Sequence, residues 1–278
     1  MIKFQEIDIV YYHGNCNDGL ASVTIFNHYY PNKKLIPLYH SKLNDLTDKD
    51  KNILFLDFSL PENKMTNLIK NNKVYIVDHH KTAMYLKNIL PKTQYLLDES
   101  ACGAMLLWKI INNNIEPPII LKYINDRDLW LNQLPNYEYV FDGLIFLKPD
   151  IKMMEDLIFD RKNIKDIIKL GKILNKSKMT SIKFLKNKMF TKEFIFKGKK
   201  YQVGYINCPL YSSDIGHFLV KKFDIDFAAI FHFNGHKTIF SLRGKGLVDL
   251  SEIAKSYGGG GHFDAAGLAL ENSVTHLI

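Results

Sequence analysis

The sequence has few cysteines and no long apolar run. Its three cysteines, Cys16, Cys102 and Cys208, are odd in number and far apart, which argues against a disulfide framework and against a thiolate zinc site. No apolar stretch approaches the ~20 residues that span a bilayer, and the first residues lack the apolar core of a secretion signal. We therefore expect a soluble, cytoplasmic protein in reducing surroundings, without a membrane partner.

Arginine is also scarce, although the chain is basic. The 278 residues carry a formal net charge of +8, yet only Arg127, Arg161 and Arg243 are arginines. A basic surface favours phosphate-rich partners such as nucleic acid, because lysine and arginine neutralise phosphates. Abundant lysine, asparagine and isoleucine are equally typical of an AT-biased genome, so the charge alone does not identify a partner.

The first half of the chain has the pattern of a parallel α/β sheet. Apolar runs at 8–12, 52–56 and 73–77 predict strands, and 19–26 and 61–70 predict helices between them. Uninterrupted apolar strands that alternate with helices are typical of a sheet buried on both faces. With 46% hydrophobic residues, the chain has ample material for the cores of two modest domains.

Polar residues stand where these strands end. Carboxyl ends of parallel strands share one edge of the sheet, where the ligands of such folds collect, so we expect these side chains in one crevice. The candidate set comprises His13, Asp18, Asp57, Asp78, His79, His80, Asp126 and Asp128.

Carboxylates with one or two imidazoles are donors that suit Mn²⁺ or Mg²⁺, and two such ions support displacement at phosphorus. Each aspartate taken alone is more often a loop residue or a helix cap, and a single histidine such as His13 more often has a structural hydrogen bond. Repetition at successive strand ends favours the metal site. Cys16 is interpreted as lining this site, because a nucleophilic cysteine needs a dedicated base.

The second half predicts a smaller mixed α/β domain. A lysine-rich stretch at 157–188 has helical spacing and is interpreted as a connecting helix. Hairpins are predicted at 193–205 and 227–243, the second with a type I′ turn at Asn234-Gly235, and a helix is predicted at 213–221. We place a catalytic domain at 1–160, a helical linker at 161–190 and a substrate-binding domain at 191–278.

A glycine cluster at 258–261 precedes His262 near the end of the chain. Glycines let a backbone approach a phosphate closely, and their amides are donors. A flexible loop is the ordinary explanation of such a run. Because Arg243 precedes it and His262 follows it, an anion clamp is the better hypothesis.

These residues resemble the motifs of the DHH phosphoesterase superfamily, in particular the branch with a C-terminal DHH-associated domain. The matching segments are 13–19 (HGNCNDG), 56–59 (LDFS), 77–80 (VDHH), 125–128 (NDRD) and 258–267 (GGGGHFDAAG). They span nearly the whole chain in the expected order, which makes the resemblance specific.

The resemblance implies a two-metal site, usually of manganese, with magnesium as the other candidate. It implies that Asp57 bridges the ions, that His80 faces the scissile phosphate and that Asp78 orients the histidine pair. The remaining implied ligands are His13 for one ion and Asp18, His79 and Asp126 for the other. The residues implied to grip the substrate are Arg243, Gly260, Gly261 and His262.

The first motif departs from the pattern of the superfamily, and the ligand of the fourth motif stays open. Many members have two aspartates in the first motif, whereas this sequence has only Asp18, with Asn15, Cys16 or Asn17 near the other position. This puts the first metal in doubt. Asp126 is preferred over Asp128 as the ligand of the fourth motif, and both stay candidates.

The predicted function is metal-dependent hydrolysis of short nucleotide substrates by a phosphodiesterase or phosphatase, with water activated by the metal. The substrates considered are oligoribonucleotides, linear or cyclic dinucleotides, and a nucleoside bisphosphate. Alternatives are a single-strand exonuclease and a non-catalytic nucleotide-binding protein. A homodimer is among the assemblies that the sequence leaves open.

Overall fold

The computed structural model describes residues 2–39 and 45–271. The chain divides into two compact units between Asn175 and Lys176, inside helix α8 (Ile164–Leu185). The predicted boundaries at 160 and 190 lie on either side of this division and stay predictions. Within the described ranges, no helix has the length and apolar character needed to cross a membrane.

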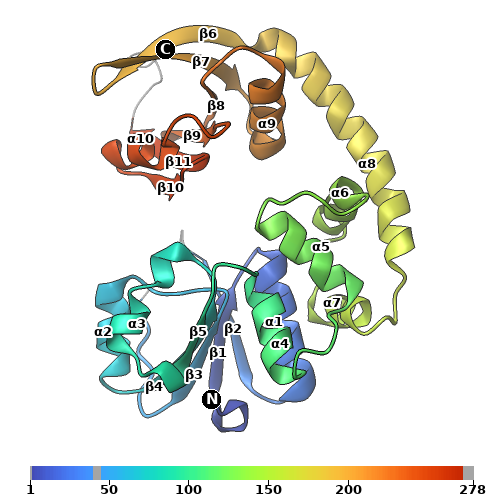
Figure 1. The fold of residues 1–278 in the computed structure, drawn as a ribbon, viewed down its shortest axis with the longest axis vertical. Coiled ribbons are helices and arrows are strands. Elements are labelled where there is room, and N and C mark those ends of the chain that lie inside the picture. Colours follow the sequence, from blue (N-terminus) through green and yellow to red (C-terminus); the bar gives the residue numbers. More distant parts are fainter. Residues whose placement is uncertain (1, 40–44, 272–278) are drawn as a thin grey trace. The chain divides into compact units, whose positions relative to one another are not determined.

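Unit 1 is built on a five-stranded sheet in which every pairing is parallel (Figure 1). The strand order is β2-β1-β3-β4-β5. The strands are β1 (Ile9–His13), β2 (Lys34–Leu38), β3 (Asn52–Leu56), β4 (Lys73–Asp78) and β5 (Tyr95–Leu97). This confirms the predicted parallel α/β fold. The edge strands β2 and β5 were not predicted, since edge strands carry a weaker apolar signal than strands buried on both faces.

Helices cover both faces of this sheet. Leu54 and Leu56 of β3 pack into one cluster, whereas Ile53 and Phe55 of the same strand pack into another, and all four are fully buried. The first cluster includes residues of α1 (Asn17–Tyr29), α4 (Gly103–Ile111), α5 (Ile119–Asp128), α6 (Tyr137–Leu147) and α7 (Ile151–Ile158). The second includes residues of α2 (Glu62–Ile69) and α3 (Leu86–Ile89). Short 3₁₀ turns lie at Phe4–Glu6, Lys81–Ala83, Lys92–Gln94 and Lys186–Lys188.

The predicted connecting helix begins later than expected. The sequence predicted helix from residue 157, but α7 ends at Ile158 and α8 starts at Ile164. Asp160 lies between them with a φ of 55°, in the left-handed region, which no right-handed helix contains. The apolar spacing on both sides of this break made the two helices look continuous.

Unit 2 carries a six-stranded mixed sheet in the order β10-β11-β9-β8-β7-β6, where β7 and β8 are parallel and the other pairs antiparallel. Its strands are β6 (Phe190–Phe196), β7 (Lys199–Asn207), β8 (Phe227–Phe233), β9 (Lys237–Arg243), β10 (Gly260–His262) and β11 (Ala265–Glu271). Helices α9 (Ser212–Lys222) and α10 (Leu250–Ser256) pack on opposite faces, because alternate residues of β8 join their two clusters. Both predicted hairpins are confirmed.

The predicted type I′ turn at Asn234-Gly235 is wrong. That turn needs a positive φ at both central residues, and only Gly235 has one, at 97°. Three residues separate β8 from β9, and the Asn234 side chain accepts hydrogen bonds from the amides of His236 and Lys237. This side-chain turn stabilises the loop without a left-handed asparagine.

Candidate metal centre

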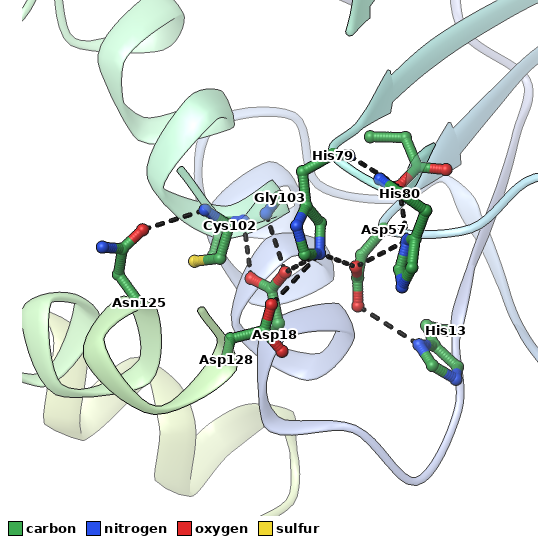
Figure 2. Close-up of polar contacts among 11 residues, drawn as sticks. His13, Asp18, Asp57, His79, His80, Cys102, Gly103, Asn125 and Asp128 are labelled. Atoms are coloured by element: carbon green, nitrogen blue, oxygen red, sulfur yellow. Dashed lines mark hydrogen bonds and ion pairs between the residues drawn. The ribbon is translucent and has the colours of Figure 1, made fainter. Parts of the chain in front are cut away.

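The site lies at the carboxyl edge of the unit 1 sheet. His13 is the last residue of β1, Asp57 follows β3 directly, and Asp78 ends β4 with His79 and His80 next in the chain. Because β1, β3 and β4 are adjacent and parallel, their ends bring these side chains together, as predicted from the sequence pattern. Figure 2 shows the resulting cluster of imidazoles and carboxylates.

Asp57 is at the centre of the cluster. Its carboxylate is 1% exposed, with Oδ2 3.3 Å from Nδ1 of His13 and Oδ1 3.3 Å from Nε2 of His79. Neither oxygen meets hydrogen-bond geometry with any residue that the structure describes. The residue has a φ of 53°, a left-handed conformation that costs free energy and is typical of functional sites. Burial alone raises the pKa of Asp57, but contacts with His13 and His79 bring it below its ordinary value.

Asp18 and Asp128 stand on the other side of His79 (Figure 2). The Nε2 atom of His79 lies 3.1 Å from Oδ2 of Asp128 and 3.7 Å from Oδ2 of Asp18. Burial, together with the charge of Asp57, raises the pKa of both aspartates. Burial and three mutually repelling carboxylates make this a place where a cation is stabilising.

Asp18 also has a structural role. Its two oxygens each accept a 2.7 Å hydrogen bond from an amide at the start of α4, those of Gly103 and Ala104. A carboxylate at a helix N-terminus satisfies orphan amides and matches the helix dipole. Gly103 permits this approach, because a Cβ there would lie 3.0 Å from Cβ of Asp57 and 3.2 Å from Oδ2 of Asp18.

The geometry favours Asp128 over Asp126, the residue preferred from the sequence. The carboxylate of Asp126 accepts hydrogen bonds from two backbone amides, that of Gln133 at 2.9 Å and that of Leu134 at 3.4 Å. Asp126 thereby organises the loop after α5. Asp128 instead reaches His79. Asn125 of the same motif accepts from the amide of Cys102 and holds the start of α4.

His80 is oriented by a buried carboxylate. Oδ1 of Asp78 lies 2.7 Å from Nδ1 of His80 and also accepts from the amides of His79 and His80. Burial lowers the pKa of His80, but the hydrogen bond and the charge of Asp78 outweigh it and raise the pKa to about 9. The other ring nitrogen, Nε2, is the atom left to meet a ligand.

Cys16 is a candidate metal ligand, although the sequence predicted only that it lines the site. Its sulfur lies within 4.8 Å of donor atoms of His13 and Asp57. Burial and the charge of Asp57 raise the pKa of the thiol, so the thiolate needs a cation for its stabilisation. The signal that could have identified Cys16 is its place in the first motif, where the expected second aspartate is missing.

The donor set fits metal binding. One group consists of His13, Cys16 and Asp57, and a second consists of Asp18, His79 and Asp128. A third grouping joins Asp57 to Asp78, His79 and His80. The two oxygens of Asp57 lie near different ligand groups. Two ligands of one ion are separated by roughly 3 Å when each metal–ligand bond is about 2.1 Å. The observed 3.3 Å contacts match this spacing.

The predicted substrate-binding residues of unit 2 lie on neighbouring strands. Arg243 of β9 pairs with Ala265 of β11, which pairs in turn with His262 of β10. Paired residues share a face of a sheet, so Arg243 and His262 flank a single small side chain. The guanidinium of Arg243 donates to Oγ of Ser213 at 2.6 Å.

The two predicted glycines, Gly260 and Gly261, belong to the same edge strand, β10. Gly261 has a φ of 144°, and a Cβ there would lie 2.5 Å from the carbonyl oxygen of Ala265. This position therefore requires glycine.

Two curated relatives match the chain in sequence. It is 28% identical over 95% of its length to the uncharacterized protein R106 of Acanthamoeba polyphaga mimivirus, of which it covers 68%. It is 25% identical over 74% of its length to oligoribonuclease NrnB of Bacillus subtilis. The chain spans 55% of NrnB. No protein-family model matches the chain.

Solved structures share the fold of this chain. The pGpG-specific phosphodiesterase PggH of Vibrio cholerae has a TM-score of 0.52 at 11% identity, covering 95% of this chain and 93% of its own. Exonuclease RecJ bound to manganese has a TM-score of 0.51 at 14% identity, covering 96% and 86%. With the motif Asp78-His79-His80 at the carboxyl edge of its parallel sheet, the chain has the same fold as these two enzymes and resembles the DHH phosphoesterase superfamily.

Proposed function

We propose that the chain is a metal-dependent phosphodiesterase that hydrolyses short nucleotide substrates. The observation that carries this proposal is the Asp57 carboxylate, which is buried and has each oxygen 3.3 Å from a different histidine. Among residues 2–39 and 45–271, neither oxygen has a hydrogen-bond partner. A carboxylate in this position is arranged to bridge two cations. Such ions, when bound, activate a water and neutralise charge on the phosphate.

The proposed ligands form two groups that share Asp57. His13 and Cys16 serve one ion together with Asp57, while Asp57, Asp18, His79 and Asp128 serve the other. Manganese and magnesium suit the oxygen and nitrogen donors of the second group. The sulfur of Cys16 makes the first group softer, so we assign it a metal such as manganese or zinc in preference to magnesium.

His80 is proposed to act on the substrate. Its Nδ1 is held by Asp78, so Nε2 is directed away from that carboxylate and is free to donate a proton to a phosphate or leaving oxygen. Asp78 is a positioning residue in this scheme, because it acts through His80. The same arrangement holds the ring in one orientation and stabilises its protonated form.

The preference for short substrates rests on two similarities. NrnB is named an oligoribonuclease, and PggH is named a pGpG-specific phosphodiesterase. In unit 2, Arg243 and His262 flank Ala265, while Gly260 and Gly261 belong to the edge strand that carries His262. This surface is proposed to bind a substrate phosphate, since a guanidinium and an imidazole can both donate to its oxygens.

The proposal is tested by product analysis with mass spectrometry. Purified protein is incubated with Mn²⁺ and with linear and cyclic dinucleotides, a nucleoside bisphosphate, short oligoribonucleotides and long single strands. We expect cleavage of the short phosphodiesters and its loss in Asp57→Ala. Preferred cleavage of long strands would identify an exonuclease, and tight nucleotide binding without cleavage of any phosphoester would identify a binding protein.

A further inference from the structure

A large cavity opens within unit 1 beside the metal cluster. It has a volume of about 1240 Å³, and its lining includes the candidate ligands His13, Cys16 and Asp128. Pockets for small ligands are typically about 300 to 1,000 Å³, so this one has room for more than the reacting phosphate group.

Arg127 lies in this lining between two aromatic rings. Its guanidinium carbon is 4.1 Å from the ring centroid of Trp130 and 4.9 Å from that of Phe141. Both rings line the same cavity. Among the described residues, no carboxylate forms an ion pair with Arg127. Stacking restrains the guanidinium while leaving its in-plane donors to bind an anion.

The direction of Arg127 is set by its place in α5. The next residue, Asp128, has its carboxylate close to His79. Two successive residues therefore contact the metal cluster and the aromatic rings, Asp128 the first and Arg127 the second. Lys148 and Lys152 add positive charge to the lining. Asp150 also lines the cavity, but its carboxylate caps helix α7 through the amide of Met153.

Trp130 offers a stacking surface. It is 40% exposed, and its φ of 54° is left-handed, which is rare for so large a side chain. An exposed indole supported by an arginine is the kind of platform on which nucleobases stack, and every base has a face suited to it. A flat aromatic group joined to a phosphate is the ligand that this combination matches.

We infer that this cavity binds one nucleotide of the substrate, with its base stacked on Trp130 and its phosphate bound by Arg127. The identity of the ligand as a nucleotide rests on the proposed function. The inference places a nucleotide-binding site in unit 1, in addition to the phosphate-binding role proposed for Arg243 and His262 in unit 2.

Tryptophan fluorescence tests this site directly. The chain has two tryptophans, both in unit 1, and Trp108 is only 6% exposed. Titrating the 278-residue chain, freed of metal, with adenosine 5′-monophosphate should quench the emission of Trp130. Ribose 5-phosphate, which lacks the base, should bind at least about fivefold more weakly by calorimetry, the smallest effect expected for one stacked base.

Matched variants separate stacking from other causes. Trp130→Ala should weaken binding of adenosine 5′-monophosphate at least about fivefold, whereas Trp130→Phe should keep the affinity and lose the fluorescence change. Arg127→Ala should weaken both probes. Leu131→Ala, an exposed neighbour outside the cavity lining, is the control and should bind both probes as wild type does.

The outcomes distinguish this inference from the proposed function. Wild-type affinity in Trp130→Ala, or full quenching in Trp130→Phe, would overturn the nucleotide site even if the protein hydrolyses dinucleotides. Binding that depends on Trp130, in a protein that cleaves no phosphoester with Mn²⁺, would support the site and reject the proposed function. Where dinucleotides are cleaved, Trp130→Ala should also raise their KM.

Discussion

Oδ1 of Asp78 lies 2.7 Å from Nδ1 of His80, and the same oxygen accepts hydrogen bonds from two backbone amides. Asp78 is fully buried, whereas the His80 side chain is 28% exposed. The buried carboxylate therefore fixes the orientation of a histidine that still reaches the site. We therefore propose that Asp78 acts on the reaction through His80, without direct contact with the substrate.

We predict that Asp78→Asn lowers kcat by about 100-fold or more, the usual contribution of a positioned acid or base, with a smaller change in KM. The neutral amide of the asparagine cannot stabilise the protonated form of His80 as the charged Asp78 carboxylate does. Steady-state kinetics on the dinucleotide identified by product analysis measure the effect.

The double variant Asp78→Asn/His80→Asn provides the control. If Asp78 acts through His80, this variant should be no slower than His80→Asn alone. Multiplicative losses would instead mean that Asp78 contributes independently, through its hydrogen bonds to the backbone. Circular dichroism of each variant shows whether the fold is retained.

Asp57→Ala should lose bound metal. Its two oxygens face the two proposed ligand groups, so its removal weakens both sites at once. We expect two Mn²⁺ per wild-type chain by elemental analysis and at most one in the variant. Because a cation that binds only the folded state raises stability, Mn²⁺ should raise the unfolding midpoint of wild type more than that of the variant.

Asp166→Asn is the matched control for this loss. Asp166 belongs to the same unit, is exposed and pairs only with Lys169 in the described structure. Its metal content and thermal shift should equal those of wild type. Two firmly bound ions in Asp57→Ala would contradict the bridging role.

The sequence predicted the gathering of His13, Asp57 and Asp78 because strand ends follow from apolar patterning. It could not decide between Asp126 and Asp128. Residues two apart on a helix point in nearly opposite directions, and which one faces the site depends on how α5 packs. That packing is a tertiary property without a local signal.

The cavity beside the metal cluster was not predicted for a related reason. Part of its lining comes from α6, whose start shows no capping side chain, since Asn136 is left-handed and makes no side-chain cap hydrogen bond. The apolar stretch at 137–147 was not assigned to an element, although Asn136 is a residue type that often precedes a helix. Arg127 and Trp130 were visible in the sequence, but their stacking occurs with a left-handed backbone at Trp130, which has no local sequence signal.

Cys16 should be detectable as a ligand by cobalt spectroscopy. Co²⁺ bound by a thiolate gives a charge-transfer band in the near ultraviolet, which oxygen and nitrogen ligands do not give. We expect this band in wild type and its absence in Cys16→Ser. Cys208→Ser, in unit 2, should keep it.

Replacement of Cys16 by aspartate should change metal preference. A carboxylate is a harder ligand than a thiolate, so Cys16→Asp should bind Mg²⁺ and Mn²⁺ more tightly relative to Zn²⁺ than wild type does. Competition calorimetry with the three metals measures this ratio. An unchanged ratio, together with an unchanged cobalt spectrum in Cys16→Ser, would remove Cys16 from the ligand set.

Asp126 and Asp128 form a matched pair for separating stability from metal binding. Asp128→Asn should weaken metal binding at least about tenfold, since it removes a ligand or its close support, and should leave the fold intact. Asp126→Asn should instead lower the free energy of unfolding by about 1 to 3 kcal/mol, because its charged carboxylate accepts the amides of Gln133 and Leu134. Calorimetric titration with Mn²⁺ and denaturant unfolding of both variants give the comparison. The opposite result, with metal lost in Asp126→Asn and retained in Asp128→Asn, would restore Asp126 as the ligand and require α5 to rotate when metal binds.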